Sequence, residues 1–171
     1  CFEKGSIKST YGTGCFLMVN TENNPVLISE GLLTTVAYKL NGQVHYALEG
    51  SIYSCGSIIK WLRDKMRFFN SAKESENFLN KSGSSNNVLF LPAFNGLGAP
   101  FWNSDIRGGF YGITQDTSIN DMITAAFLAI AFQTKEITTI LEKYNIEIGK
   151  LHIDGGMVPV SYTNLRAHET I

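Results

Sequence analysis

The sequence has few of the residues that mark special classes of protein. It contains 3 cysteines, 4 prolines and 3 histidines in 171 residues, and 14 basic residues are balanced by 15 acidic ones. Cys1, Cys15 and Cys55 are widely spaced and form neither a disulfide framework nor a CxxC metal site. The net charge of −1 offers no attraction for nucleic acid or an anionic membrane. We therefore predict a cytoplasmic protein that binds neither, with no metal held by its own side chains.

The chain also lacks long apolar runs. The longest, Ala125–Phe132, is far below the roughly 20 residues that span a membrane, so we expect no membrane span. No basic stretch followed by an apolar core opens the chain, and it begins with Cys1 instead of methionine. We therefore expect no secretory signal and regard the chain as a piece of a longer protein. With 44% apolar residues, 171 residues can bury the core of one domain.

Periodicity and turn signals predict a mixed α/β fold. Asn41-Gly42 tolerates positive φ at both turn positions, which favours a hairpin between strands at 32–40 and 43–48. With a strand at 14–20 they would form an N-terminal β-meander that Glu49-Gly50 closes. Further along, we expect helices at 53–68, 72–80 and 119–143 and strands at 88–91, 110–114 and 151–153. The later strands would return parallel to the sheet, with the helices on its faces.

Two local signals stand out in the second half of the chain. Ser118 comes three residues before Asp121, a capping-box pattern that predicts the start of the long helix. The segment from Pro92 to Gly109 is rich in glycine, proline and aromatic residues. A loop of that length is uncommon without a function.

Two glycine turns are the candidate functional elements. Gly12-Thr13-Gly14 follows one short strand, and Gly155-Gly156 follows another about 140 residues later. Glycine lets the backbone approach a ligand closely, and the N–H groups of such a turn suit a phosphate oxygen. The two turns would hold one nucleotide from two sides. On spacing alone, two ordinary tight turns remain an alternative.

Several longer strings carry a family resemblance. In chain order they are Thr10-Tyr-Gly-Thr-Gly-Cys-Phe16, Glu30-Gly-Leu-Leu-Thr-Thr35, Tyr46-Ala-Leu-Glu-Gly50, Trp61-Leu-Arg-Asp64, Pro92-Ala-Phe-Asn-Gly-Leu-Gly-Ala-Pro-Phe-Trp102 and Asp154-Gly-Gly156. With these strings, the chain resembles the glycerol kinases of the FGGY family of carbohydrate kinases over about residues 1–157. The resemblance implies an actin-like (ribonuclease H-like) second domain, incomplete at residues 1–158, with an atypical tail at 159–171.

The resemblance implies a reaction and its partners. The γ-phosphoryl group of Mg-ATP would pass to glycerol, giving glycerol 3-phosphate and ADP. ATP and Mg²⁺ would be the cofactors, and an N-terminal domain of the same chain would complete the cleft. A homo-oligomer stays open. The family's catalytic aspartate lies before the stretch that matches Cys1, so we expect no catalytic residue in this chain and no turnover by it alone.

The resemblance also implies roles for individual residues at the positions that match the family's motifs. Thr13 and Gly14 would line the ATP phosphates, and Gly56 would approach the nucleotide closely. Gly156 would contact the adenosine side, with Gly155 supporting the turn. Phe16 would form an apolar wall against the carbon backbone of glycerol.

Some residues depart from the family pattern or carry two interpretations. Lys60 stands where the family has a glutamine that faces the nucleotide, so it is not included in the site. Asp154 could touch the magnesium shell or could cap the turn that follows it. Two other functions stay open: another FGGY sugar kinase, similar to xylulokinase or fuculokinase, and a non-catalytic nucleotide-binding module.

Overall fold

The computed structural model describes residues 2–79 and 87–157. Its strands are β1 (Ile7–Tyr11), β2 (Cys15–Glu22), β3 (Leu33–Leu40), β4 (Gln43–Ile52), β5 (Leu89–Leu91), β6 (Gly109–Tyr111) and β7 (Leu151–Asp154). Its helices are α1 (Gly56–Asp64), the short 3-10 helix η1 (Ala72–Ser75), α2 (Glu76–Leu79) and α3 (Ile119–Lys143). The tail at 159–171 lies outside the described residues, so the domain boundary at 158 stays a prediction.

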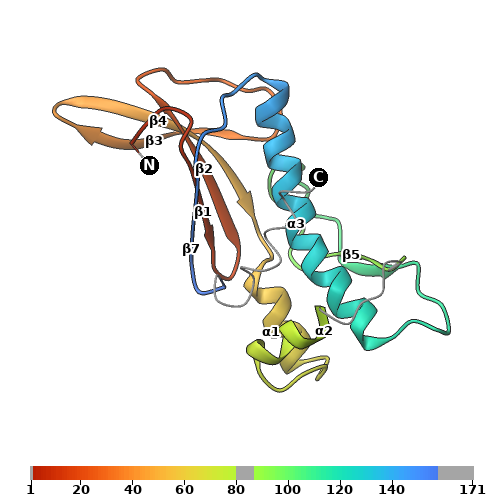
Figure 1. Cartoon of the computed structure of the whole chain (residues 1–171). Coiled ribbons are helices and arrows are strands. Elements are labelled where there is room, and N and C mark those ends of the chain that lie inside the picture. Colours follow the sequence, from red (N-terminus) through yellow and green to blue (C-terminus); the bar gives the residue numbers. More distant parts are fainter. Residues whose placement is uncertain (1, 80–86, 158–171) are drawn as a thin grey trace.

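The main sheet has five strands in the order β3-β4-β2-β1-β7, and β7 alone runs parallel to its neighbour (Figure 1). The predicted mixed sheet is therefore confirmed, but its N-terminal part is not a meander. β4, and not β3, pairs with β2, from Cys15↔Ile52 to Glu22↔Tyr46. Burial explains the order: β4 is almost wholly buried over residues 47–52, as suits an inner strand, whereas β3 is largely exposed, as suits an edge.

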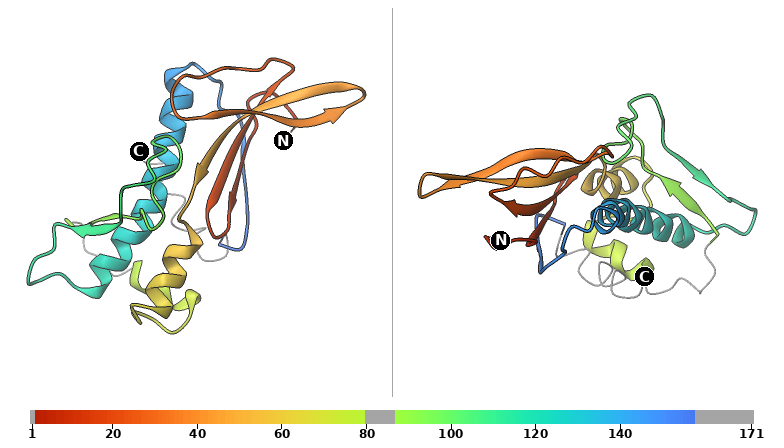
Figure 2. Two further views of the ribbon diagram at one scale, coloured as in Figure 1. Left: turned by 180° about the vertical axis from the view of Figure 1, so that it is seen from behind. Right: turned by 90° about the horizontal axis from the view of Figure 1, so that it is seen from above.

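The β3–β4 hairpin forms at the predicted turn. Asn41 has φ of 49° and Gly42 of 81°, as a two-residue hairpin loop requires, and the hairpin extends away from the rest of the molecule (Figure 2). The predicted strand end at Glu49-Gly50 is wrong, because β4 continues to Ile52. A Cβ at Gly50 would lie 2.7 Å from Cδ1 of Ile137. This glycine therefore lets α3 approach the sheet and does not turn the chain.

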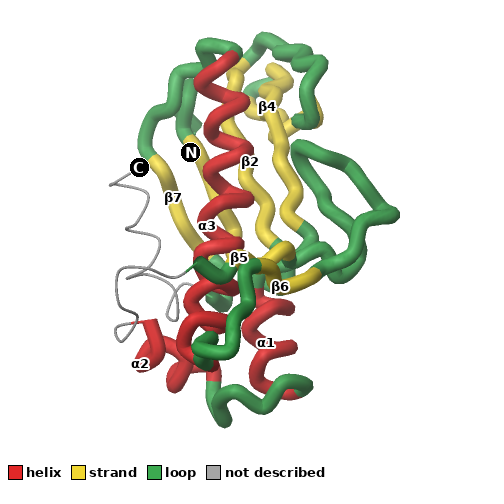
Figure 3. The backbone as a smooth tube through the Cα atoms, turned by 90° about the vertical axis from the view of Figure 1, so that its right-hand side faces the viewer, coloured by secondary structure: helices red, strands yellow, loops and turns green. Residues whose placement is uncertain are grey.

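α3 runs along one face of the main sheet and covers its core (Figure 3). Alternate residues of the central strands point toward it, and the hydroxyl groups of Tyr11 and Thr134 lie 3.2 Å apart across the interface. The helix begins as predicted: the Ser118 side chain accepts from the Asp121 N–H, and the Asp121 carboxylate accepts from the Ser118 N–H. Within the described part of the chain, no helix is long and apolar enough to cross a membrane.

Three other predicted elements differ from the structure. The helix expected at 53–68 is confined to α1, and that expected at 72–80 is divided between η1 and α2. β5 and β6 form a separate antiparallel sheet, so only β7 returns parallel to the main one. Leu97 and Asn103 exchange backbone hydrogen bonds of 2.8 and 3.0 Å inside the intervening loop. This pairing folds the loop back on itself and brings β6 beside β5.

Candidate functional site

The two glycine turns lie side by side at one end of the main sheet. The parallel pairing of β1 and β7 places Thr10 opposite Asp154, so both strands end at the same edge. The Met157 N–H then donates to the Tyr11 carbonyl at 3.1 Å. Gly155 has φ of +108°, and a Cβ there would lie 2.2 Å from the same carbonyl oxygen, so this position requires glycine. The expected convergence of the two turns is found.

The start of α1 is bound directly to the first turn. The Cys55 and Ser57 N–H groups donate to the Thr13 carbonyl at 3.0 and 3.1 Å, and the Gly56 N–H donates to the Gly12 carbonyl at 2.9 Å. A Cβ at Gly56 would lie 2.5 Å from that Gly12 oxygen. The position therefore requires glycine, because a side chain would overlap the carbonyl oxygen of the turn. The turn's carbonyls satisfy N–H groups that a helix start leaves without intrahelical partners.

A cavity of about 670 Å³ opens between the two turns and one face of α1. Backbone and small side chains form its floor, and three charged side chains and two large apolar ones form its walls. The lining residues are Gly12, Thr13, Gly56, Ser57, Lys60, Trp61, Asp64, Lys65, Gly156 and Met157. This mixture of apolar wall and a few polar groups is typical of a small-molecule site.

Trp61 is held in place on the α1 wall. Its ring stacks on Phe90 at 6.1 Å and 9°, and it lies 5.1 Å from the ring of Phe94. These contacts join α1 to β5 and to the start of the long loop. A flat apolar surface with a fixed orientation therefore forms part of the cavity.

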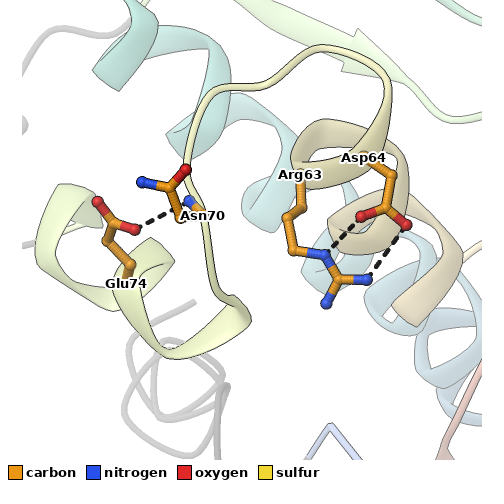
Figure 4. A network of polar contacts seen from close by, with 4 residues as sticks. All are labelled: Arg63, Asp64, Asn70 and Glu74. Carbon is orange, nitrogen blue, oxygen red and sulfur yellow. Dashed lines mark hydrogen bonds and ion pairs between the residues drawn. The ribbon is translucent and has the colours of Figure 1, made fainter.

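The carboxylate of Asp64 on the same wall is already paired. Arg63 Nε and Nη2 donate to its two oxygens at 2.6 and 3.1 Å (Figure 4). These bonds hold the pKa of Asp64 below its usual range, with smaller contributions from Lys60 and Arg67. The Asp64 carboxylate is thus ionised, its charge is offset by Arg63, and it is poorly suited to accept a proton.

A separate contact holds the segment after α1, where the Asn70 N–H donates to Glu74 Oε2 at 2.9 Å (Figure 4).

The residues predicted to bind the nucleotide divide into those that line the cavity and those that only shape the turns. Thr13, Gly56 and Gly156 line the cavity, and a Cβ at Gly156 would meet nothing within 4 Å. Gly14 and Gly155 lie in the turns beside it but face other backbone. A Cβ at Gly14 would lie 2.5 Å from the Ile52 carbonyl. Both support the shape of the turns.

Sequence reasoning missed most of the α1 wall. Ser57, Lys60, Trp61, Asp64 and Lys65 all line the cavity, and Lys60 had been set aside. Their spacing of three or four residues is that of one helix face. This spacing could have identified them once Gly56 was placed at the start of a helix next to the first turn.

Phe16 lies away from the cavity. Cys15, Leu17 and Val19 point into the core, so Phe16 points to the opposite face of β2, where it pairs with Thr10 and Ser51. Its side chain is 53% exposed, and it is not part of the cavity lining. The structure therefore does not bring Phe16 together with the cavity residues, and its role stays a prediction.

Asp154 lies on this same exposed face of the sheet. Its carboxylate is 3.0 Å from the ammonium group of Lys8, and hydrogen bonds from Thr10 and Lys8 lower its pKa. Residues 2–79 and 87–157 contain no group of three or more His, Cys, Asp or Glu side chains that could hold a metal ion. Asp154 is thus paired with neighbours on its own face of the sheet.

Cys15 follows the first turn but is buried in the core. Its thiol is fully buried and lies 3.2 Å from the Ser9 hydroxyl, and burial raises its pKa to about 11. A thiol in this state is a poor nucleophile. It serves as a small core residue beneath the turn.

Comparison with known proteins identifies the family. The profile of the FGGY family of carbohydrate kinases, C-terminal domain, matches residues 7–163. The chain belongs to the FGGY family of carbohydrate kinases. It is 50% identical over 159 residues to a glycerol kinase of Halalkalibacterium halodurans and 47% identical to one of Staphylococcus haemolyticus. Each alignment covers 92% of this chain, which spans about a third (32%) of each relative.

Solved FGGY kinases share the fold. The crystal structure of Plasmodium falciparum glycerol kinase with ADP matches with a TM-score of 0.83 and 40% identity, covering 92% of this chain and 32% of that one. A xyloylose kinase from Brucella ovis matches with a TM-score of 0.80 at 20% identity, over 94% of this chain and 32% of that one. The predicted actin-like fold class is therefore confirmed.

Proposed function

We propose that this chain forms the nucleotide-binding half of a glycerol kinase, which transfers the γ-phosphoryl group of ATP to glycerol and yields glycerol 3-phosphate. One observation carries the proposal: the cavity between the two glycine turns and α1 occurs in a chain about half identical to curated glycerol kinases. The likeness to a glycerol kinase solved with ADP supports a nucleotide as the ligand of this cavity.

The proposed nucleotide contacts follow from the cavity lining. Thr13 would donate its hydroxyl hydrogen to a phosphate oxygen, and Gly156, with open space at its Cα, would admit the adenosine part. Trp61 would offer an apolar surface to that part of the ligand. Gly14 and Gly155 would act indirectly, by allowing the close backbone contacts that shape the turns.

Glycerol would bind on the other side of the first turn. Phe16 is two residues beyond Gly14, and its exposed ring would contact the carbon backbone of the polyol. The remaining polar contacts and the base that accepts the hydroxyl proton would come from the rest of a longer protein. The relatives are about three times as long as this chain, which supports a site divided between this chain and the rest of a longer protein.

Transfer of a phosphoryl group requires mainly positioning and neutralisation of charge, and this half of the site would supply part of each. Magnesium would arrive with ATP and be held by phosphate oxygens and water, where it offsets the phosphate charge. The described residues fit that arrangement, since residues 2–79 and 87–157 hold no cluster of three or more His, Cys, Asp or Glu side chains that would bind the ion by itself. We also propose a cytoplasmic location, which two free buried thiols, Cys15 and Cys55, suit.

A direct assay tests this function. The complete polypeptide encoded by the gene should phosphorylate glycerol in the presence of Mg-ATP, with product measured by a coupled glycerol 3-phosphate dehydrogenase reaction. Xylulose and fuculose should be much poorer acceptors, and preference for either would replace glycerol kinase with another sugar kinase. The 171-residue chain alone should give no turnover, because Asp64 is the one carboxylate among the described residues of its cavity and already pairs with Arg63. Nucleotide binding without turnover by the complete polypeptide would favour a non-catalytic module.

A further inference from the structure

The fold uses one N–H group of the first glycine turn and three at the start of α1. The Gly12 N–H donates to the Gly14 carbonyl at 2.8 Å, inside the first turn. The N–H groups of Cys55, Gly56 and Ser57 all donate to carbonyls of the same turn. These four N–H groups are therefore not free to bind a phosphate chain in the cavity, and side chains of the lining can supply further donors.

Lys60 is the charged donor nearest to the turns along α1. It follows Gly56 by four residues, about one helical turn or roughly 6 Å, and it lines the cavity with Thr13. Within residues 2–79 and 87–157, its ammonium group has no ion-pair or hydrogen-bond partner. The nearby carboxylate of Asp64 is held by Arg63 at 2.6 and 3.1 Å. The charge of Lys60 is thus available to a ligand.

Ser57 adds a second unused donor between the turn and Lys60. Its Oγ is buried, lines the cavity region and has no hydrogen-bond partner among the described residues. A buried hydroxyl without a partner is unusual in a folded protein and calls for an explanation, such as a bound water or ligand. Thr13, Ser57 and Lys60 thus all belong to the lining of the same cavity.

We propose that Lys60 binds the phosphate chain of the nucleotide, with the hydroxyl group of Ser57 as a neighbouring donor. Together they would supply donors beside the N–H groups of Gly12 and the α1 start, which the fold itself uses. The inference rests on the proposed nucleotide site and assigns a role to a residue that sequence reasoning had excluded. A lysine at this position contributes a full positive charge, which a neutral glutamine would not.

The test separates phosphate from nucleoside. Affinities of ADP and adenosine for the complete polypeptide are measured by calorimetry, without magnesium, for the unmodified protein and for Lys60→Gln. Because a hydrogen bond between charged groups is lost, ADP should bind about tenfold more weakly to Lys60→Gln. Adenosine should bind with less than about a twofold change, because it carries no phosphate. Lys60→Arg should retain most of the ADP affinity.

Lys73→Gln is the matched control, since Lys73 carries the same charge but lies in η1 and is not among the residues that line the cavity. It should change ADP affinity by less than about threefold. Equal losses for Lys60→Gln and Lys73→Gln would overturn the assignment, as would unchanged ADP affinity or equal losses of ADP and adenosine. If the unmodified protein bound neither ligand, the proposed nucleotide site itself would fail.

Discussion

Replacing Gly56 with alanine tests whether this glycine serves the contact between α1 and the first turn. The new Cβ would lie 2.5 Å from the Gly12 carbonyl oxygen, closer than real Cβ contacts allow. Backbone forms both sides of the contact, so the helix or the turn must move by several tenths of an ångström. The movement strains the Gly56–Gly12 hydrogen bond of 2.9 Å and the Ser57–Thr13 bond of 3.1 Å.

The magnitude follows from those two bonds. At about 0.5–1.5 kcal/mol each, their loss costs about 1–3 kcal/mol, offset by up to about 1 kcal/mol from the better helix propensity of alanine. A net loss of about 1–2 kcal/mol lowers Tm by roughly 2–8 °C in a domain of this size. Thermal unfolding followed by circular dichroism measures the change. Gly156→Ala is the control, since its Cβ would meet nothing within 4 Å, and Tm should stay the same. Equal Tm values for the two variants would refute the reasoning.

Two further predictions concern stability and pH. Ser118→Ala removes the capping box of α3 and should lower stability by about 1 kcal/mol in denaturant unfolding at neutral pH. Hydrogen bonds from Ser118 hold the pKa of Asp121 low, so the part of the contribution that comes from the carboxylate is present above about pH 4 and is lost as pH falls through the folded-state pKa. The bond from the Asp121 N–H to the Ser118 hydroxyl remains in acid, so the stability gap between the two proteins should narrow there, and a gap of unchanged size would contradict the prediction. Tyr11→Phe removes a hydroxyl whose pKa burial raises to about 12, so the unmodified protein should keep the tyrosine's contribution below about pH 10 and lose it as pH rises toward 12. Parallel stability curves for the two proteins between pH 9 and 12 (about two units around that pKa) would rule this out.

Local signals predicted the elements whose causes are local. Asn41-Gly42 specifies its hairpin because both residues tolerate positive φ, and the measured values of 49° and 81° agree. Ser118 and Asp121 specify the start of α3 because each satisfies the other's backbone N–H. These predictions needed no knowledge of the rest of the chain.

Other positions could not be interpreted from neighbouring residues. The sequence Glu49-Gly50 predicts the end of a strand, yet Gly50 lies within β4, and glycine is needed there because the side chain of Ile137 occupies the space of its missing Cβ. The position of β4 between β2 and β3 likewise follows from burial against α3, which sequence order does not reveal. In both cases the partner lies far away along the chain.

The sequence by itself determined the type of most elements, the two glycine turns and, through its longer strings, the family. Only the tertiary structure decided which groups face the shared cavity. Glycine marks places where the backbone comes close to something, but not whether that neighbour is a ligand or the protein's own carbonyls. At Gly14, Gly56 and Gly155 the neighbour is backbone, whereas Gly156 faces open space. Two side-chain donors of the cavity, Ser57 and Lys60, come from α1, and their position depends on how the helix packs against the turn.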